Sequence, residues 1–181
     1  MALLLDLINV VDIEATCWES KTPPGQESEI IEIGICTLEV STGKSIDRDS
    51  ILIKPERSTV SDFCTQLTTL TPEQVDQGIS FKEACQLLRS KYLSRDRVWA
   101  SYGQYDKNQF TRQCESRGIS YPFNQRHINV KTLFALKQKL PYEVGMSQAL
   151  EILNFTLEGT HHRGIDDAGN IAKILSELLN E

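Results

Sequence analysis

The alternation of apolar and polar side chains predicts three strands in the first third of the chain. Residues 3–13 are rich in Leu, Ile and Val, which is typical of a buried strand. Residues 29–40 carry isoleucine at alternate positions, and residues 45–53 return along them after a turn at 41–44. Residues 21–26 include two prolines and a glycine, so we expect a loop there. This part of the chain is therefore predicted to be one long strand followed by a hairpin.

From residue 71 onwards, apolar residues recur at helical spacing between short strands. Thr71 followed by Pro72 is typical of a helix start, and the apolar residues of 81–88 share one helical face. We predict short strands at 98–101 and 128–130, and helices at 104–117, 131–139, 147–153 and 165–179. Strands first and then strands alternating with helices predict a single α/β domain over residues 1–181, with a mixed sheet.

The composition is that of an ordinary globular protein with an acidic balance. Hydrophobic residues make up 40% of the chain, and 19 basic against 25 acidic side chains give a net charge of −6. A broad nucleic-acid-binding surface normally carries an excess of basic residues, which this chain does not have. Any polyanion must therefore be held locally, by a metal ion or a small pocket.

The cysteines and the first residues indicate the compartment. Five scattered cysteines without a C-x-x-C pair favour a reducing compartment over a disulfide framework or a zinc site. The apolar opening run contains Asp6, lacks a basic leader and is too short to span a bilayer. We therefore expect a cytoplasmic protein that does not bind membranes.

Acidic residues follow two of the predicted strands. Asp12 and Glu14 end the first strand, and a spacing of two places both carboxylates on the same face. Asp106 opens the helix after the fourth strand and brings a third acid to this edge of the sheet. Carboxylates are the ligands that Mg²⁺ and Mn²⁺ prefer. The alternatives are a solvated strand end for Asp12 and Glu14, and an acid that offsets the helix dipole for Asp106.

The densest polar cluster is residues 161–167, which lead into the last helix. Asp167 lies four residues before the apolar Ile171, so helical spacing predicts that it faces inward. Asp166 instead aligns with Asn170 on the predicted exposed face. An inward acid is costly unless it is paired or bound to a metal ion, so Asp167 is the candidate ligand.

Three short motifs occur in a characteristic order along nearly the whole chain. They are Asp12-Ile13-Glu14, then Tyr105-Asp106, then His162 with Asp167 five residues later. In this order they resemble the DEDDh exonucleases, a family of the ribonuclease H-like fold. Residues 12–18, 61–64 and 164–167 are similar to the subgroup that trims histone-mRNA 3′ ends and small RNAs. The resemblance implies a mixed five-stranded sheet flanked by helices.

The resemblance also implies a 3′-5′ exonuclease with two divalent ions, Mg²⁺ or Mn²⁺, in its active site. Asp12, Glu14 and Asp167 would hold one ion. Asp12 would bridge to a second ion, which Asp106 would support directly or through water. Such a pair stabilises the attacking and leaving oxygens of an in-line displacement at phosphorus.

Two adjacent histidines have the spacing expected of the general base. His161 lies five residues before Asp166, and His162 lies five residues before Asp167. Because Asp167 is the acid predicted to face inward, the spacing assigns the base to His162, which would accept a proton as a neutral imidazole. His161 is then expected to be a loop residue with a supporting role at most.

The resemblance implies a substrate as well: single-stranded RNA or DNA 3′ ends, with RNA favoured, cut to nucleoside 5′-monophosphates. Ala15 and Thr16 are similar to the site for the terminal 3′-OH. Leu67 and Leu70 resemble positions that pack on the terminal base, with plain core leucines as the alternative. Arg163 is the nearest candidate for a phosphate contact, unless it is simply a solvated loop residue.

Two other functions are compatible with these residues. One is a catalytically silent module of the same fold that binds nucleic acid or protein, and the other is a small-molecule phosphodiesterase using the same metals. A missing acid or histidine would favour the silent module, and none is missing. Because the first motif begins at Asp12, we expect no additional nucleic-acid-binding module ahead of it.

Overall fold

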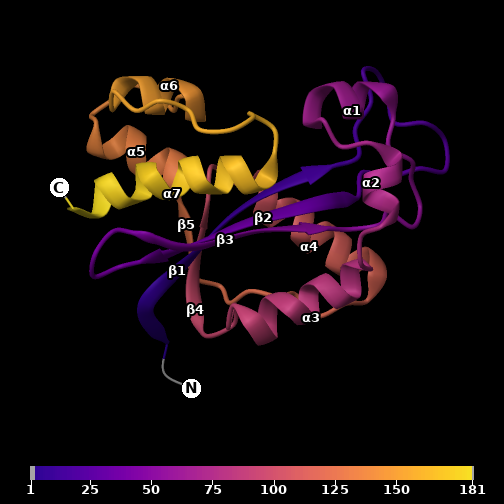
Figure 1. Cartoon of the computed structure of the whole chain (residues 1–181), viewed down its shortest axis with the longest axis horizontal. Helices are drawn as coiled ribbons and strands as arrows, with labels where there is room; N and C mark the ends of the chain where they lie inside the picture. Colours follow the sequence, from indigo (N-terminus) through magenta and orange to yellow (C-terminus); the bar gives the residue numbers. More distant parts are fainter. Residues whose placement is uncertain (1–2, 181) are drawn as a thin grey trace.

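The sheet at the centre of the molecule has five strands in the order β3-β2-β1-β4-β5 within residues 3–180, the part of the chain that this computed structural model describes. The strands are β1 (Leu4–Ala15), β2 (Ile30–Glu39), β3 (Ser45–Leu52), β4 (Arg97–Ser101) and β5 (His127–Asn129). β2 runs antiparallel to β1 and β3, whereas β4 runs parallel to β1 and β5 (Figure 1). The predicted mixed sheet is therefore confirmed.

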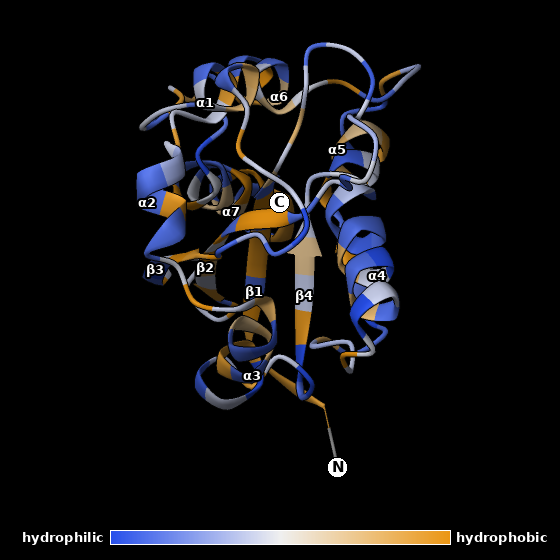
Figure 2. Cartoon of the chain, turned by 90° about the vertical axis from the view of Figure 1, so that its right-hand side faces the viewer, coloured by the Kyte–Doolittle hydropathy of each residue, from blue (hydrophilic) through white to orange (hydrophobic). Residues whose placement is uncertain are grey.

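Helices cover both faces of this sheet. They are α1 (Asp62–Thr68), α2 (Pro72–Asp76), α3 (Phe81–Lys91), α4 (Tyr105–Arg117), α5 (Val130–Lys137), α6 (Met146–Ile152) and α7 (Gly164–Asn180). α5, α6 and α7 pack on one face, and α3 and α4 pack on the other. Figure 2 shows the hydrophobic strands between these layers. Among residues 3–180, no helix has the length and apolar character needed to cross a membrane.

Local capping signals explain where several helices begin and end. Thr71 and Ser80 each form a reciprocal capping box at the start of α2 and α3. Gly118 ends α4 in the left-handed conformation, with φ 62°. α1 is missing from the sequence prediction, although Ser61 caps it by accepting a hydrogen bond from the Cys64 amide at 3.0 Å.

Alternation along β1 determines which side of the sheet each residue faces. Val10 belongs to the core beneath α7, whereas Val11 and Ile13 belong to the core beneath α3 and α4. Asp12 and Glu14 follow Val10 at steps of two, so both point to the α7 side at the end of the strand. This confirms the prediction that the two acids share a face.

α7 begins one residue before the predicted start and buries Asp167 (3% exposed) and Ile171, as predicted. Asn170, however, is fully buried, so its predicted exposed position is wrong. Its side-chain amide exchanges hydrogen bonds with the backbone of Glu158, at 3.0 Å and 2.9 Å. Tertiary hydrogen bonding to the preceding loop therefore overrides the simple helical pattern here.

A close contact between two glycines sets the position of the first turn of α7. A Cβ atom added to Gly34 of β2 would lie 1.8 Å from the carbonyl carbon of Gly164, which no real side chain can do. Gly164 in turn lies against the Gly34 amide and the Asp12 carbonyl. The start of α7 consequently sits directly on the strand pair that carries Asp12.

Candidate active site

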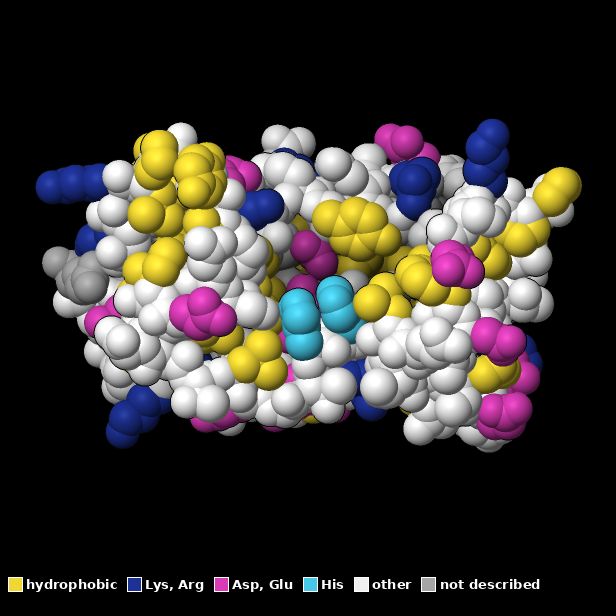
Figure 3. Space-filling model, turned by 90° about the horizontal axis from the view of Figure 1, so that it is seen from above, with side chains coloured by type: hydrophobic (Ala, Val, Ile, Leu, Met, Phe, Trp, Pro, Cys, Tyr) yellow, Lys and Arg dark blue, Asp and Glu magenta, His cyan; other side chains and the backbone are white. Residues whose placement is uncertain are grey.

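A cavity of about 380 Å³ opens at the ends of β1 and β4 and contains every acid that the sequence selected. Its walls include the carboxylates of Asp12, Glu14, Asp106 and Asp167 and the rings of His161 and His162. In Figure 3, histidine rings sit at the mouth of a hollow beside acidic side chains, with hydrophobic side chains around the rim. The structure therefore brings together residues from β1, α4, the 161–163 loop and α7.

Three of the carboxylates form a compact group, which we call the acidic triad: Asp12, Glu14 and Asp167. Each offers one oxygen, and the three oxygens lie within 4.8 Å of one another. Asp106 stands beside the triad and is held by the strand itself, because its Oδ1 accepts a hydrogen bond from the Ile13 amide at 3.1 Å. The predicted set of three close acids and a fourth nearby is thus present in this structure.

Burial raises the pKa of all four acids when no cation is present, and repulsion from neighbouring carboxylates adds to this shift at Asp12 and Glu14. Burial, followed by the charge of Asp167, raises the pKa of Glu14 from 4.5 to about 9. Burial raises the pKa of Asp106 to about 6, and it also raises the pKa of Asp167. Burial and the neighbouring acids raise the pKa of Asp12 well above its usual range. A bound cation would remove this repulsion and favour the ionised forms.

The donor set fits a hard divalent cation. The acidic triad offers only carboxylate oxygens, which is the chemistry that Mg²⁺ and Mn²⁺ select. Asp167 Oδ1 is also buried without a hydrogen-bond partner among the described residues, a costly arrangement for a polar atom. A metal ligand role accounts for that unpaired oxygen.

Both histidines lie at the same carboxylate. His161 Nδ1 is 2.9 Å from Asp167 Oδ2, and the backbone amide of His162 donates to the same oxygen, also at 2.9 Å. The two rings stack with centroids 4.0 Å apart. Burial, followed by the charge of His161, lowers the pKa of His162, which keeps its imidazole neutral near pH 7. His161 is thus closer to the site than the sequence suggested, and the assignment of the base to His162 stays a prediction.

The four predicted substrate contacts divide into two pairs. Ala15 and Leu67 line the cavity, and Leu67 is 38% exposed. Thr16 is fully buried, and its Oγ1 accepts a hydrogen bond from the Glu29 amide at 2.9 Å. Leu70 is also fully buried. Thr16 and Leu70 therefore do not line the cavity, and their contact with the substrate stays a prediction.

Five further residues, to which the sequence analysis assigned no role, complete the walls of the cavity: Ile13, Cys17, Tyr102, Tyr105 and Met146. Tyr105 is 57% exposed at the first position of α4, immediately before Asp106. A large aromatic residue exposed beside a site acid is the signal that would have identified it, because such side chains normally seek burial.

Arg163, the candidate phosphate contact, is engaged inside the protein instead. Its Nε lies 3.3 Å from Oε2 of Glu32, a fully buried acid on β2 opposite Glu14. The same Glu32 oxygen accepts a hydrogen bond from the Gly164 amide at 2.9 Å. This pairing holds the 161–163 loop and the start of α7 against β2. Arg163 therefore helps to position the two histidines and Asp167.

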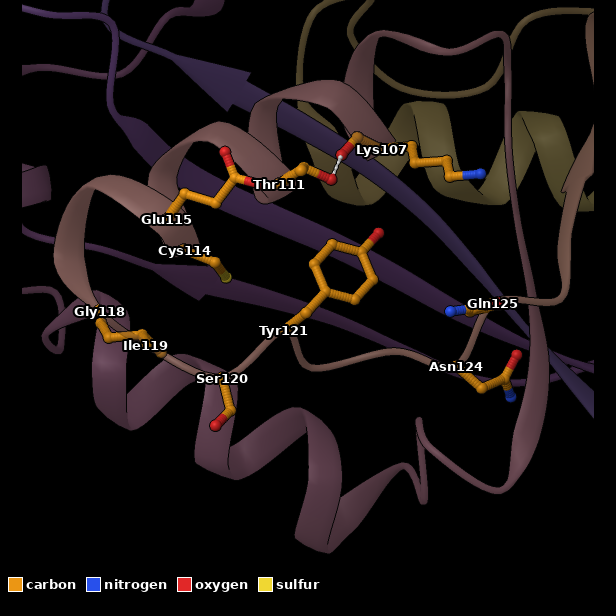
Figure 4. A pocket seen from close by; sticks show the side chains of 10 residues that line it. All are labelled: Lys107, Thr111, Cys114, Glu115, Gly118, Ile119, Ser120, Tyr121, Asn124 and Gln125. Atoms are coloured by element: carbon orange, nitrogen blue, oxygen red, sulfur yellow. Dashed lines mark hydrogen bonds between the residues drawn. The ribbon is translucent and has the colours of Figure 1, made fainter.

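A larger cavity of about 760 Å³ lies elsewhere, between α4 and the loop that follows it. Figure 4 shows its lining side chains, among which Glu115 is the sole acid and no histidine occurs. Size alone therefore does not mark the reactive site; the convergence of titratable groups in the smaller cavity does.

Comparison with known proteins agrees with this geometry. The sequence model of the Exonuclease (RNase_T) family matches residues 10–175. Human 3′-5′ exoribonuclease 1 is 32% identical over 186 residues, which cover 97% of this chain and 53% of that protein. The chain thus spans about half the length of that relative.

Solved structures give the same result. The nuclease domain of 3′hExo, a DEDDh family member solved bound to rAMP, superimposes with a TM-score of 0.86 at 31% identity, covering 97% of this chain and 92% of that one. A 3′-exonuclease solved in a study of 3′-end-specific recognition of histone mRNA stem-loop gives 0.85 at 30% identity, covering 98% and 65%. With the ribonuclease H-like sheet, the four acids and the histidine in place, this chain belongs to the DEDDh group of the exonuclease family.

Proposed function

We propose that this chain is a divalent-metal-dependent 3′-5′ exonuclease that acts on single-stranded RNA and releases nucleoside 5′-monophosphates. The observation that carries the proposal is the acidic triad, three carboxylates whose oxygens lie within 4.8 Å of one another in a cavity with a neutral imidazole at its mouth. Such a group is unstable as three bare anions and is well suited to divalent cations.

Each polar residue then has a separate task. Asp12, Glu14 and Asp167 hold one Mg²⁺ or Mn²⁺ ion, and Asp12 together with Asp106 serves a second. Two such ions, when bound, stabilise charge on the attacking and leaving oxygens of a phosphodiester. His162 accepts the proton of the attacking water, for which its lowered pKa keeps the ring nitrogen free.

The walls of the cavity favour attack at a chain end. Its volume of about 380 Å³ is at the lower end of the range for small-ligand sites, which suits one terminal nucleotide. Leu67 and Tyr105 both line the cavity with exposed apolar surface and would hold the terminal base. Ala15, at the tip of β1, lies where the terminal 3′-OH would meet the backbone.

The preference for RNA is supported by the relatives. The human relative is named an exoribonuclease, and one similar structure contains rAMP while another concerns histone mRNA 3′ ends. By that similarity we propose RNA 3′-end trimming as the class of reaction. All five cysteines are free thiols, which supports a reducing compartment such as the cytoplasm.

The test uses 5′-labelled single-stranded RNA and DNA of the same sequence, each with a 3′-hydroxyl or a 3′-phosphate. With Mg²⁺ or Mn²⁺ we expect a ladder that shortens from the 3′ end, faster for RNA, and strongly slowed by the 3′-phosphate. Chelator and the Asp12→Asn variant should both abolish it. Cleavage of a circular strand, or full activity in chelator, would refute the proposal.

The same assay distinguishes the nuclease from the catalytically silent binding module. If the wild-type protein retards labelled RNA in a gel but leaves it intact with either ion, the chain binds without cutting. Asp12→Asn is the matched comparison, because it removes one carboxylate charge while keeping the shape of the side chain.

A further inference from the structure

A second group of metal-binding side chains, which we call the histidine triad, lies beside the acidic triad. It consists of His161, His162 and Asp167, whose ligand atoms also lie within 4.8 Å of one another. We propose that the histidine triad is a separate transition-metal site, suited to Zn²⁺, and that a zinc ion there blocks the enzyme. The inhibition rests on the proposed nuclease function, whereas the binding site does not.

The donor atoms distinguish the two triads. Imidazole nitrogens are ligands for Zn²⁺ and its neighbours in the transition series, whereas Mg²⁺ binds oxygen. Two nitrogens and one carboxylate oxygen, with a fourth position open to water, make a common zinc ligand set in proteins. The acidic triad contains oxygen donors alone, so it lacks the nitrogen ligands that favour Zn²⁺ over Mg²⁺.

One pair of ligand atoms in the histidine triad is already close to the separation that zinc requires. Zinc–ligand distances of about 2.0–2.1 Å place tetrahedral ligands roughly 3.3 Å apart. His161 Nδ1 is already 2.9 Å from Asp167 Oδ2. The His161 side chain is 43% exposed, so it can turn to meet an ion arriving from solvent. The backbone amide of His162, bonded to Asp167, keeps the second imidazole beside the same carboxylate.

The carboxylate of Asp167 has two oxygens in different surroundings. Its Oδ2 faces both histidines, while its Oδ1 is buried without a partner among residues 3–180, in a side chain only 5% exposed. Two oxygens of different surroundings allow Asp167 to serve both triads at once. Zinc in the histidine triad therefore need not displace Mg²⁺ from the acidic triad.

Inhibition follows from the imidazole instead. A zinc ion held by either ring nitrogen of His162 places positive charge on the imidazole, so the ring no longer accepts the proton from water while substrate and Mg²⁺ remain bound. Adding Mg²⁺ should therefore fail to relieve the inhibition. Zinc that competed for the acidic triad would show the opposite behaviour.

The binding test measures zinc affinity directly, by competition with a chromophoric chelator, in wild type, His161→Ala and His161→Gln. Loss of an outer-sphere partner already lowers metal affinity by about 10–100-fold, so loss of a ligand should cost about 100-fold or more. Co²⁺ used as a probe should give the visible absorption of a four-coordinate ion in wild type alone. His161 is half exposed, so these variants should fold, which circular dichroism would check.

Two control variants remove neighbouring candidate ligands. Cys17→Ser removes a thiol from the wall of the same cavity. Asp166→Asn removes the carboxylate next to Asp167; in the wild type this Asp166 carboxylate accepts a hydrogen bond from the Thr160 amide. Both should bind zinc as wild type does. Equal zinc affinity in wild type and the two His161 variants would overturn the proposed site.

The activity test then examines inhibition. At saturating Mg²⁺, zinc at about 20 times its measured wild-type dissociation constant leaves only about 5% of the wild-type sites free, so it should slow single-turnover cleavage by wild type at least about tenfold more than cleavage by His161→Ala. A tenfold increase in Mg²⁺ should not restore the wild-type rate; full restoration would place zinc in the acidic triad and refute the inhibition. A protein with no activity in zinc-free Mg²⁺ would refute the proposed function alone, and the binding comparison would still decide the site.

Discussion

Glu14 makes the stability of the metal-free protein depend on pH in an unusual direction. Its side chain is buried beside other acids, and its pKa is raised from 4.5 to about 9. Between these two pH values the unfolded chain releases the proton while the folded chain keeps it. The folded state therefore loses stability as the pH rises from 4.5 to about 9. The contribution of Glu14 is fully present only below pH 4.5. We expect Glu14→Gln to remove the contribution of Glu14 to this dependence, because an amide does not ionise, while the other buried acids keep theirs.

The size of the effect follows from proton linkage. Inside the window each pH unit changes the unfolding free energy by about 1.36 kcal/mol for one proton. From pH 5 to pH 8 the wild type should lose up to about 4 kcal/mol through Glu14. This is a large part of the 5–15 kcal/mol that is typical of a whole domain. The variant should thus gain up to about 4 kcal/mol on wild type over this interval.

Urea unfolding in chelator at pH 5, 6.5 and 8 measures this difference, with the fluorescence of the buried Trp99 as the probe. Glu19→Gln, at an exposed acid outside the site, is the matched control and should run parallel to wild type. Saturating Mn²⁺ should flatten the wild-type profile, because the ion replaces the proton. Parallel pH profiles for wild type and Glu14→Gln in chelator would refute the reasoning.

Four other substitutions separate catalytic chemistry, substrate contact and structural support. His162→Ala should lower the single-turnover rate by about 10²–10⁴-fold while stabilisation by Mn²⁺ persists, and a rate near wild type would remove it as the base. Leu67→Ala should raise KM with little effect on stability, whereas Leu70→Ala should cost about 2–5 kcal/mol in urea unfolding and leave KM alone. Gly34→Ala should push Gly164 away and weaken Mn²⁺ binding in calorimetry; unchanged affinity would show that their contact does not position the metal ligands.

The convergence of the acids was predictable because it depends on strand and helix periodicity. A step of two along β1 puts Asp12 and Glu14 on one face, and a step of four along α7 turns Asp167 toward the core. The parallel pairing of β1 with β4 then carries Asp106 to the same edge. These rules depend on local spacing, and the fold obeys them.

What the sequence did not reveal depends on contacts between distant segments. Leu70 has the same local character as Leu67, but it follows Thr69, which has a φ of 62°, and turns into the core with Cys64 and Val75. The nearness of His161 to Asp167 arises where His162 takes a φ of 66°, a left-handed backbone state that is uncommon for residues other than glycine. The spacing of hydrophobic residues in the sequence does not reveal either of these two positive-φ turns.

The contact of Gly34 with Gly164 also makes the position of the first turn of α7 independent of side-chain packing in the rest of the core. Because backbone meets backbone there, the first turn of α7 rests on the sheet without relying on how side chains interlock. Leu178 lies fourteen residues further along, roughly 21 Å away at 1.5 Å per residue. Apolar substitutions at that distance can tilt the far end of the helix about this fixed point and leave Asp167 in register with β1. The hydrophobic core under the far end of α7 should therefore tolerate substitution while the spacing of the acidic triad is kept.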